Sequence, residues 1–155
     1  MSKSSRVKVQ VFSDIVCPWC FIGKRRWDSV IKELTEVDVE LIWRPYQLYP
    51  GLPYEGIDRR EYLLRRYGDS AVNRSAPRRI EDEAKSVGIE LRYDLIRKIP
   101  NTAYAHYLLE WSLEFGLQHD LAEALFQAYF CRGVDVGETR SLTNICAVSY
   151  THLTL

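Results

Sequence analysis

The chain has 155 residues, of which 46% are hydrophobic and 27% are charged. This composition is typical of one soluble domain with a substantial core, and it excludes a disordered chain or a fibrous protein. The 21 Lys and Arg residues balance 21 Asp and Glu residues, so the formal net charge is zero. We therefore expect neither nucleic acid nor a membrane surface as a partner.

The N-terminal residues run directly into a strand pattern. They contain neither the apolar segment nor the small-residue cleavage site of a secretory signal. We therefore expect a cytoplasmic protein, in which glutathione and thioredoxin hold thiols mostly reduced. That setting favours a reductase or isomerase over an oxidase.

The first part of the chain predicts a strand, a helix and a second strand. The apolar run from Val7 to Phe12 predicts a strand, and apolar residues at helical spacing then predict a helix to about Thr35. Residues 37–43 alternate as in a strand, which stops at Arg44-Pro45 because proline cannot continue a ladder. This order predicts parallel strands joined by a right-handed crossover. The apolar positions expected on the buried face of the helix are Ile22, Trp27, Val30, Ile31 and Leu34.

Four helices are expected in succession after a loop over residues 46–57. Four helices behind a strand-helix-strand unit predict an all-helical insertion over the active end of the sheet. Their arginines are interpreted as solvated helix faces. The start and stop signals are Asp58 and Gly68, then Ser75 or Ala76 with Pro77 and Gly88, then Asn101 or Thr102 and Gly116, and finally Gly133. The arginines are Arg59, Arg60, Arg65, Arg66, Arg78 and Arg79.

The Cys17-Pro18-Trp19-Cys20 motif carries the chemistry. Residues three apart share one face of a helix, so both sulfurs can reach bonding distance. Pro18 suits the first helical position, because the N–H that it lacks has no partner there. Cys17 then lies at the positive end of the helix dipole, which lowers a thiol pKa. We expect Cys17 to be the nucleophile, with the lower pKa, and the deeper Cys20 to be the resolving residue.

A metal site and a structural disulfide are the alternatives for this pair. Structural zinc requires a second pair of ligands, and the sequence offers none at the right spacing, so no metal is expected. A disulfide closing so short a loop constrains the unfolded chain very little. Redox chemistry is therefore the favoured interpretation. The remaining cysteines and histidines, Cys131, Cys146, His106, His119 and His152, are isolated from one another in the sequence.

Several segments resemble the DsbA-like branch of the thioredoxin superfamily, in particular its cytosolic FrnE-like dithiol oxidoreductases. The resemblance covers the chain from about Val7 to Leu142. It implies an α/β, thioredoxin-like fold of DsbA type with a helical insertion. It also implies thiol-disulfide exchange, as an oxidoreductase or isomerase, through Cys17 and Cys20. The segments that carry it are residues 12–24 (FSDIVCPWCFIGK), 43–48 (WRPYQL), 100–106 (PNTAYAH) and 123–130 (EALFQAYF).

The resemblance also divides the chain. It implies an N-terminal βαβ unit over residues 7–45, a helical insertion over residues 46–142 and a tail over residues 147–155 that matches nothing in the family and is interpreted as non-native. Family members return to the sheet with further strands and a cis-proline loop, whereas all six prolines here lie before that point. We therefore expect a chain truncated before the C-terminal part of the sheet. Low activity and self-association through the uncovered sheet are expected to follow.

The resemblance implies substrate-binding roles for four residues. Trp19 is expected beside the reactive sulfur, and Arg44, Asn101 and His106 are expected near the cleft. Asn101 is equally a good helix cap, and His106 a packed residue of the core. The expected substrates are thiols and disulfides, in proteins or small molecules, with no cofactor besides the redox-active disulfide.

Two other functions stay open. One is a glutathione-dependent isomerase or transferase related to the hydroxychromene carboxylate isomerases, with glutathione as co-substrate. That branch carries serine where this chain has Cys17, which argues against it. The other is an inactive fragment or a binding module whose cysteines matter little.

Overall fold

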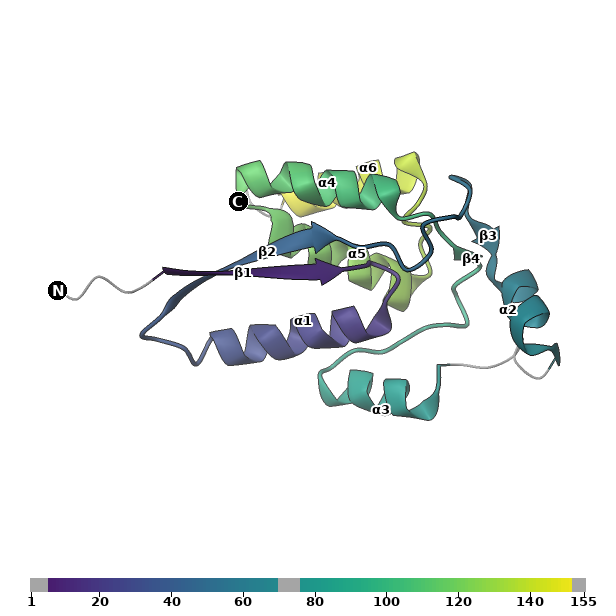
Figure 1. Cartoon of the computed structure of the whole chain (residues 1–155), viewed down its shortest axis with the longest axis horizontal. Coiled ribbons are helices and arrows are strands. Elements are labelled where there is room, and N and C mark those ends of the chain that lie inside the picture. The colour runs from purple at the N-terminus through teal and green to yellow at the C-terminus, as the bar shows by residue number, and fades with distance from the viewer. Residues whose placement is uncertain (1–5, 70–75, 152–155) are drawn as a thin grey trace.

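The N-terminal unit consists of two parallel strands and one helix. The computed structural model describes residues 6–69 and 76–151. In it, β1 (Arg6–Ser13) and β2 (Asp38–Pro45) are joined by α1 (Pro18–Ile31) (Figure 1). The register pairs Val9 with Leu41 and ends with Ser13 opposite Pro45. The order and the parallel pairing are those predicted from the sequence.

The described residues contain five further α-helices. They are α2 (Arg59–Tyr67), α3 (Arg78–Ser86), α4 (Ala103–Ser112), α5 (Gln118–Arg132) and α6 (Thr139–Thr151), with a 3-10 turn over Leu113–Phe115 after α4. The predicted cap of α2 is present, because the Asp58 carboxylate accepts the Glu61 N–H at 2.8 Å. Pro77 directly precedes α3, whereas the alternative start at Ser75 lies outside the described residues.

A short ribbon that the sequence does not predict precedes α2. It pairs β3 (Ile57–Asp58) with β4 (Lys98–Ile99) in antiparallel fashion. Two-residue strands carry no periodicity from which they could be recognised. The Arg59 N–H donates to the Arg97 carbonyl at 2.9 Å, so the ribbon fixes the first residue of α2.

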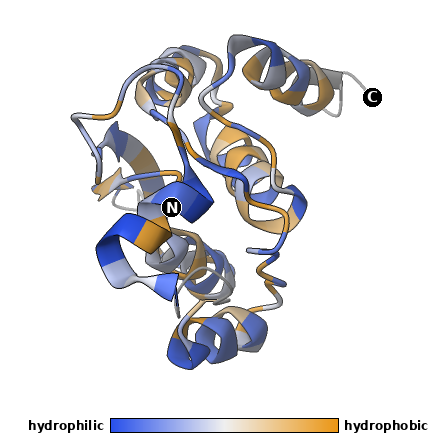
Figure 2. Cartoon of the chain, turned by 90° about the vertical axis from the view of Figure 1, so that its right-hand side faces the viewer, coloured by the Kyte–Doolittle hydropathy of each residue, from blue (hydrophilic) through white to orange (hydrophobic). Residues whose placement is uncertain are grey.

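The core lies between α1, α5 and β2. Phe21 of α1 stacks on Phe126 of α5 with ring centroids 5.1 Å apart. Trp43 of β2 meets the same Phe126 ring edge to face at 6.1 Å. In addition, α4 packs on β2, α6 packs on α5, and α3 packs on α1. Figure 2 shows α3, at the bottom of that view, coloured mostly as hydrophilic.

The buried face of α1 is shorter than predicted. The helix ends at Ile31, and its buried side chains are Phe21, Ile22 and Lys24. Val30 and Leu34, expected on that face, are instead 56% and 47% exposed. The reason is that the burial of α1 is confined to its N-terminal half, where α3 and α5 contact it.

The end of α5 is a point of close backbone contact. Gly133 follows α5 with φ 65°, a conformation that glycine adopts without strain. A Cβ atom there would lie 2.4 Å from the Leu95 carbonyl oxygen. The Arg92 N–H also donates to the Phe130 carbonyl at 2.7 Å. Segment 92–95 therefore rests on the C-terminal turn of α5.

The outer edge of the parallel sheet is open within the described residues. There β1 pairs only with β2, and its Val7 and Phe12 side chains are 44% and 67% exposed. Self-association through this edge stays a prediction.

The C-terminal helix crosses the boundaries drawn from the sequence. It runs without interruption through positions 142 and 147 to Thr151, and residues 152–155 of the expected non-native tail lie outside the described residues. Within the described part of the chain, every helix is too short or too polar to cross a membrane.

Candidate redox site

The cysteine motif lies where β1 leads into α1. Cys17 is the N-cap residue of α1 and Pro18 is its first helical residue, as the spacing predicts. The Cys17 N–H donates to the Asp14 carbonyl at 3.1 Å, and the Cys20 N–H donates to the Cys17 carbonyl at 3.1 Å. These backbone bonds hold both thiols on the first turn of the helix.

Both cysteines are half-buried free thiols. The hydrogen bond between the sulfurs is the main influence on both. It raises the pKa of Cys17 far above its ordinary value, with burial acting in the same direction. It lowers the pKa of Cys20 to about 6, against the opposing effect of burial. These directions are the reverse of the sequence expectation, which placed the lower pKa at Cys17.

The reversal follows from a single shared proton. When two thiols form one hydrogen bond, the first proton leaves the pair readily and the second is held more tightly. The first ionisation of the pair is therefore favoured, whichever sulfur carries the charge. The N–H groups of Trp19 and Cys20 favour the thiolate at Cys17, as expected at a helix N-terminus.

Two buried polar residues lie behind the pair. The Ser13 hydroxyl lowers the pKa of Cys20, and it has no fully formed hydrogen bond among the described residues. Asp14 is 1% exposed, and its carboxylate lies 3.2 Å from His106 Nε2 while accepting the Leu48 N–H at 2.7 Å. Its negative charge raises the pKa of Cys20. The backbone N–H of Asp14, like the Ser13 hydroxyl, lowers the pKa of Cys20, so only the carboxylate charge of Asp14 acts in the opposite direction.

Two arginines of the helical part approach the motif from different helices. The Arg79 guanidinium of α3 lies over the Trp19 ring, 5.8 Å from its centroid, and Trp19 is 42% exposed. The Arg59 guanidinium of α2 lies over the Tyr93 ring at 5.1 Å. Arg79 is exposed, in agreement with the interpretation of the arginine group as solvated helix faces, whereas Arg59 is half-buried and departs from it. The sequence around each arginine could not predict these contacts, because the aromatic partners lie far away in the sequence.

Comparison with known proteins agrees with this geometry. Residues 8–148 match the DSBA-like thioredoxin domain. The chain belongs to that family. It is 28% identical over 139 residues to the uncharacterised protein YwbO of Bacillus subtilis, covering 90% of this chain and 64% of that protein.

A solved structure is also similar. The crystal structure of a probable DsbA oxidoreductase from Streptomyces coelicolor matches with a TM-score of 0.78 and 26% identity, covering 92% of this chain and 62% of that one. The chain thus spans less than two thirds of the length of both relatives. The match establishes a DsbA-like thioredoxin fold of mixed α/β type.

The remaining predicted site residues of this DsbA-like domain bond to residues other than the two cysteines. Asn101 is buried, its amide donates to the Leu52 carbonyl at 2.8 Å, and its Oδ1 accepts the Ala103 N–H at 2.9 Å. These bonds agree with its alternative role as a cap. Arg44 pairs with Glu110 at 3.3 Å. His106 contacts the site through Asp14, as described above.

The other cysteines of the DsbA-like domain have a different environment. Burial raises the pKa of Cys131 and of Cys146 above the ordinary value, which disfavours the reactive thiolate. Across residues 6–69 and 76–151, no three Cys, His, Asp or Glu side chains are grouped so that they could hold a metal ion. Reactive thiolate character is therefore favoured only at the motif.

Proposed function

We propose that the protein is a thiol-disulfide oxidoreductase that acts through Cys17 and Cys20. The observation that carries the proposal is the pair of half-buried free thiols on the first turn of α1, with Cys17 as its N-cap residue. The pKa of Cys20, lowered to about 6, supports it. Membership of the DSBA-like thioredoxin family supports it. So does the similar structure from Streptomyces coelicolor, described as a probable DsbA oxidoreductase. A FrnE-like, cytoplasmic dithiol reductase is the finer form of this proposal.

The exchange proceeds in two balanced steps. The Cys17 thiolate attacks one sulfur of a substrate disulfide, forming a mixed disulfide and releasing the other substrate sulfur as a thiolate. Cys20 then loses its proton and attacks the Cys17 sulfur, which releases the second substrate thiolate. The substrate gains two electrons and the protein becomes the Cys17–Cys20 disulfide. A dithiol reductant returns it to the starting state.

We infer a role for each sulfur from its surroundings. Cys17 is the N-cap residue, and the exposed Trp19 follows two residues later, which supports Cys17 as the sulfur that an incoming disulfide meets. Cys20 faces the Ser13 hydroxyl and the buried Asp14. Ser13 can donate to the thiolate that forms when Cys20 resolves the mixed disulfide.

Replacement of Cys17 by serine tests the proposal. We expect the Cys17→Ser variant to lose at least about 100-fold in the rate of insulin reduction by a dithiol reductant, because it lacks the attacking thiolate. Cys131→Ser is the matched control, since that thiol is half-buried and lies outside the motif. A wild-type protein that fails to accelerate insulin reduction, or a Cys17→Ser variant as active as wild type, contradicts the proposal.

A further inference from the structure

Two cations of the helical part lie over aromatic rings at or near the reactive pair. Arg79 lies over Trp19, which stands between the two cysteines. Arg59 lies over Tyr93, and burial raises the pKa of Tyr93 while the charge of Cys17 raises it further. The Tyr93 ring meets the Phe130 ring at 6.0 Å, and Phe130 stacks at 6.1 Å on Phe21, the residue directly after Cys20. The helices that carry the arginines, α2 and α3, are separate elements of the helical part (Figure 1).

Within the described part of the chain, neither of these two arginines forms an ion pair. No carboxylate in residues 6–69 and 76–151 forms an ion pair with Arg59 or Arg79, whereas neighbouring Arg78 pairs with Asp82 and Arg65 pairs with Glu61. A guanidinium stacked on a ring keeps its N–H edge available for an anion. Both guanidinium groups therefore have N–H donors available for an anion, Arg79 at the Trp19 ring and Arg59 at the Tyr93 ring.

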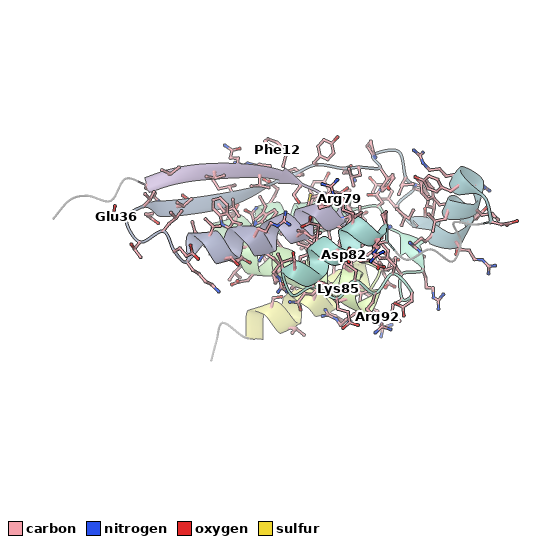
Figure 3. All side chains as sticks on the ribbon, turned by 90° about the horizontal axis from the view of Figure 1, so that it is seen from below. Phe12, Glu36, Arg79, Asp82, Lys85 and Arg92 are labelled. Carbon is pink, nitrogen blue, oxygen red and sulfur yellow. The ribbon has the colours of Figure 1, made fainter. Side chains whose placement is uncertain are left out.

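The backbone around each arginine is anchored. Arg59 begins α2, directly after the β3–β4 ribbon, and its own N–H is bound to Arg97. Arg79 is the second residue of α3, whose Glu83 forms an ion pair with Arg26 of α1. Figure 3 labels Arg79 on α3, which packs against α1. The positions of the two cations relative to the motif are thus set by the fold.

We propose that Arg59 and Arg79 bind carboxylates on either side of the substrate sulfur, so that the preferred substrates are acidic thiols and disulfides. This inference rests on the proposed exchange at Cys17 and adds the class of substrate. Two single guanidinium groups on separate helices suit two separate carboxylates. A phosphate site would gather its cations and backbone N–H groups around one point.

One carboxylate acts against this preference. Glu81 of α3 also influences Tyr93 by raising its pKa. The flank of the motif nevertheless carries two guanidinium groups. Exposed charges of this kind act mainly on encounter rate and substrate choice, and their effect weakens with salt.

The test is a single-turnover comparison of matched disulfides. The full chain is reduced, freed of reductant and mixed with a disulfide-linked peptide dimer in which two Glu residues flank each Cys, or with its Gln counterpart. We expect the acidic dimer to react about tenfold faster at low salt, and this preference to shrink at about 0.5 M salt. Oxidised glutathione, with its own carboxylates, is a separate arm that tests small acidic disulfides. A preference in either arm supports the inference and shows which source provides the carboxylates.

Variants assign the preference to the two residues. We expect Arg59→Gln and Arg79→Gln each to reduce the acidic-to-neutral rate ratio about threefold. Arg78→Gln is the matched control on the same helix, and its ratio should equal that of wild type. Equal rates for acidic and neutral disulfides in an otherwise active wild type overturn the inference and leave the proposed function standing. A wild type that exchanges with neither disulfide overturns both.

Discussion

Helix α1 carries two polar clusters with opposite properties. At its start, two thiols share one proton and the nearby Ser13 hydroxyl lacks a fully formed hydrogen bond. One turn further, the Lys24 side chain is 3% exposed, with its Nζ 2.8 Å from Asp28 Oδ2 and 2.9 Å from Glu123 Oε2. In the first cluster, the thiols and the Ser13 hydroxyl remain available for chemistry. In the second cluster, the Lys24 ammonium is paired with two carboxylates.

The ion cluster extends from α1 to α5 and β2. His119 of α5 contacts Asp28 Oδ1 through Nε2 at 2.6 Å, and its Nδ1 accepts the Trp43 indole N–H at 3.2 Å. Arg25 pairs with Glu123 at 2.5 Å. The cluster therefore connects the helix that carries the cysteines to the central helix of the core. The reactive thiols and the ion cluster that fixes α1 to α5 are therefore separated by a single turn of one helix.

The largest expected effect concerns the ion cluster. Lys24→Met should lower the free energy of unfolding by about 2 kcal/mol, because the two partner carboxylates lose their buried cation. Lys32→Met, at an exposed position directly after α1, should change it by less than about 0.5 kcal/mol. Urea unfolding measures both. The exchange rate per folded molecule should remain that of wild type. A variant that keeps its stability but loses exchange would show that the two clusters are not separate.

A smaller effect is expected on the free energy of unfolding at acidic pH. Burial alone would raise the pKa values of Asp28 and Glu123, but hydrogen bonds led by those from Lys24 hold both pKa values below their ordinary range. A lowered folded-state pKa contributes stability above the unfolded value, and that stability disappears as the pH falls through the folded pKa. Wild type should therefore lose stability below about pH 4. The double variant Asp28→Asn, Glu123→Gln should show a shallower loss in urea melts between about pH 5 and pH 2. Identical slopes would exclude this linkage.

The smallest effect concerns the redox end. Ser13→Ala should raise the pKa of the pair's first ionisation, because the thiolate loses a nearby hydroxyl donor. Alkylation near pH 6 should slow about threefold, whereas the rate at high pH should not change. Ser29→Ala, an exposed position on α1, is the control. Mapping the alkylated residue also decides whether Cys17 or Cys20 carries the thiolate. Labelling at Cys20 alone would overturn the assignment of Cys17 as the nucleophile.

Local rules account for what the sequence predicted correctly. Proline at the first helical position and cysteines three apart define the motif without reference to any distant residue. The alternation of β2 and the apolar run of β1 likewise predict the parallel unit. The Asp58 cap and the Gly133 stop depend on one or two residues each. Features of this kind are readable because their cause lies within one turn of chain.

The remaining features depend on partners far along the chain. Lys24 looks like an exposed helix residue until Glu123, 99 positions later, is placed beside it. Arg79 resembles any other arginine of the insertion until α3 packs on α1 and places it over Trp19. For the same reason, the sequence did not predict that Phe21 is buried, and it wrongly placed Val30 on the buried face of α1. Periodicity indicates which face of a helix is apolar, but not which half of it a neighbour covers.

Gly133 limits which substitutions this chain can accept. Its missing side chain accommodates the Leu95 carbonyl, and the segment seated there includes Tyr93, over which Arg59 lies. Any larger residue at position 133 would displace that segment and tilt the tyrosine relative to the first cysteine. A mutational library aimed at new substrates should therefore vary α2 and α3 while keeping residue 133 constant. Alanine at this position would therefore disturb the tyrosine that Arg59 covers, although the altered residue lies at the far end of α5.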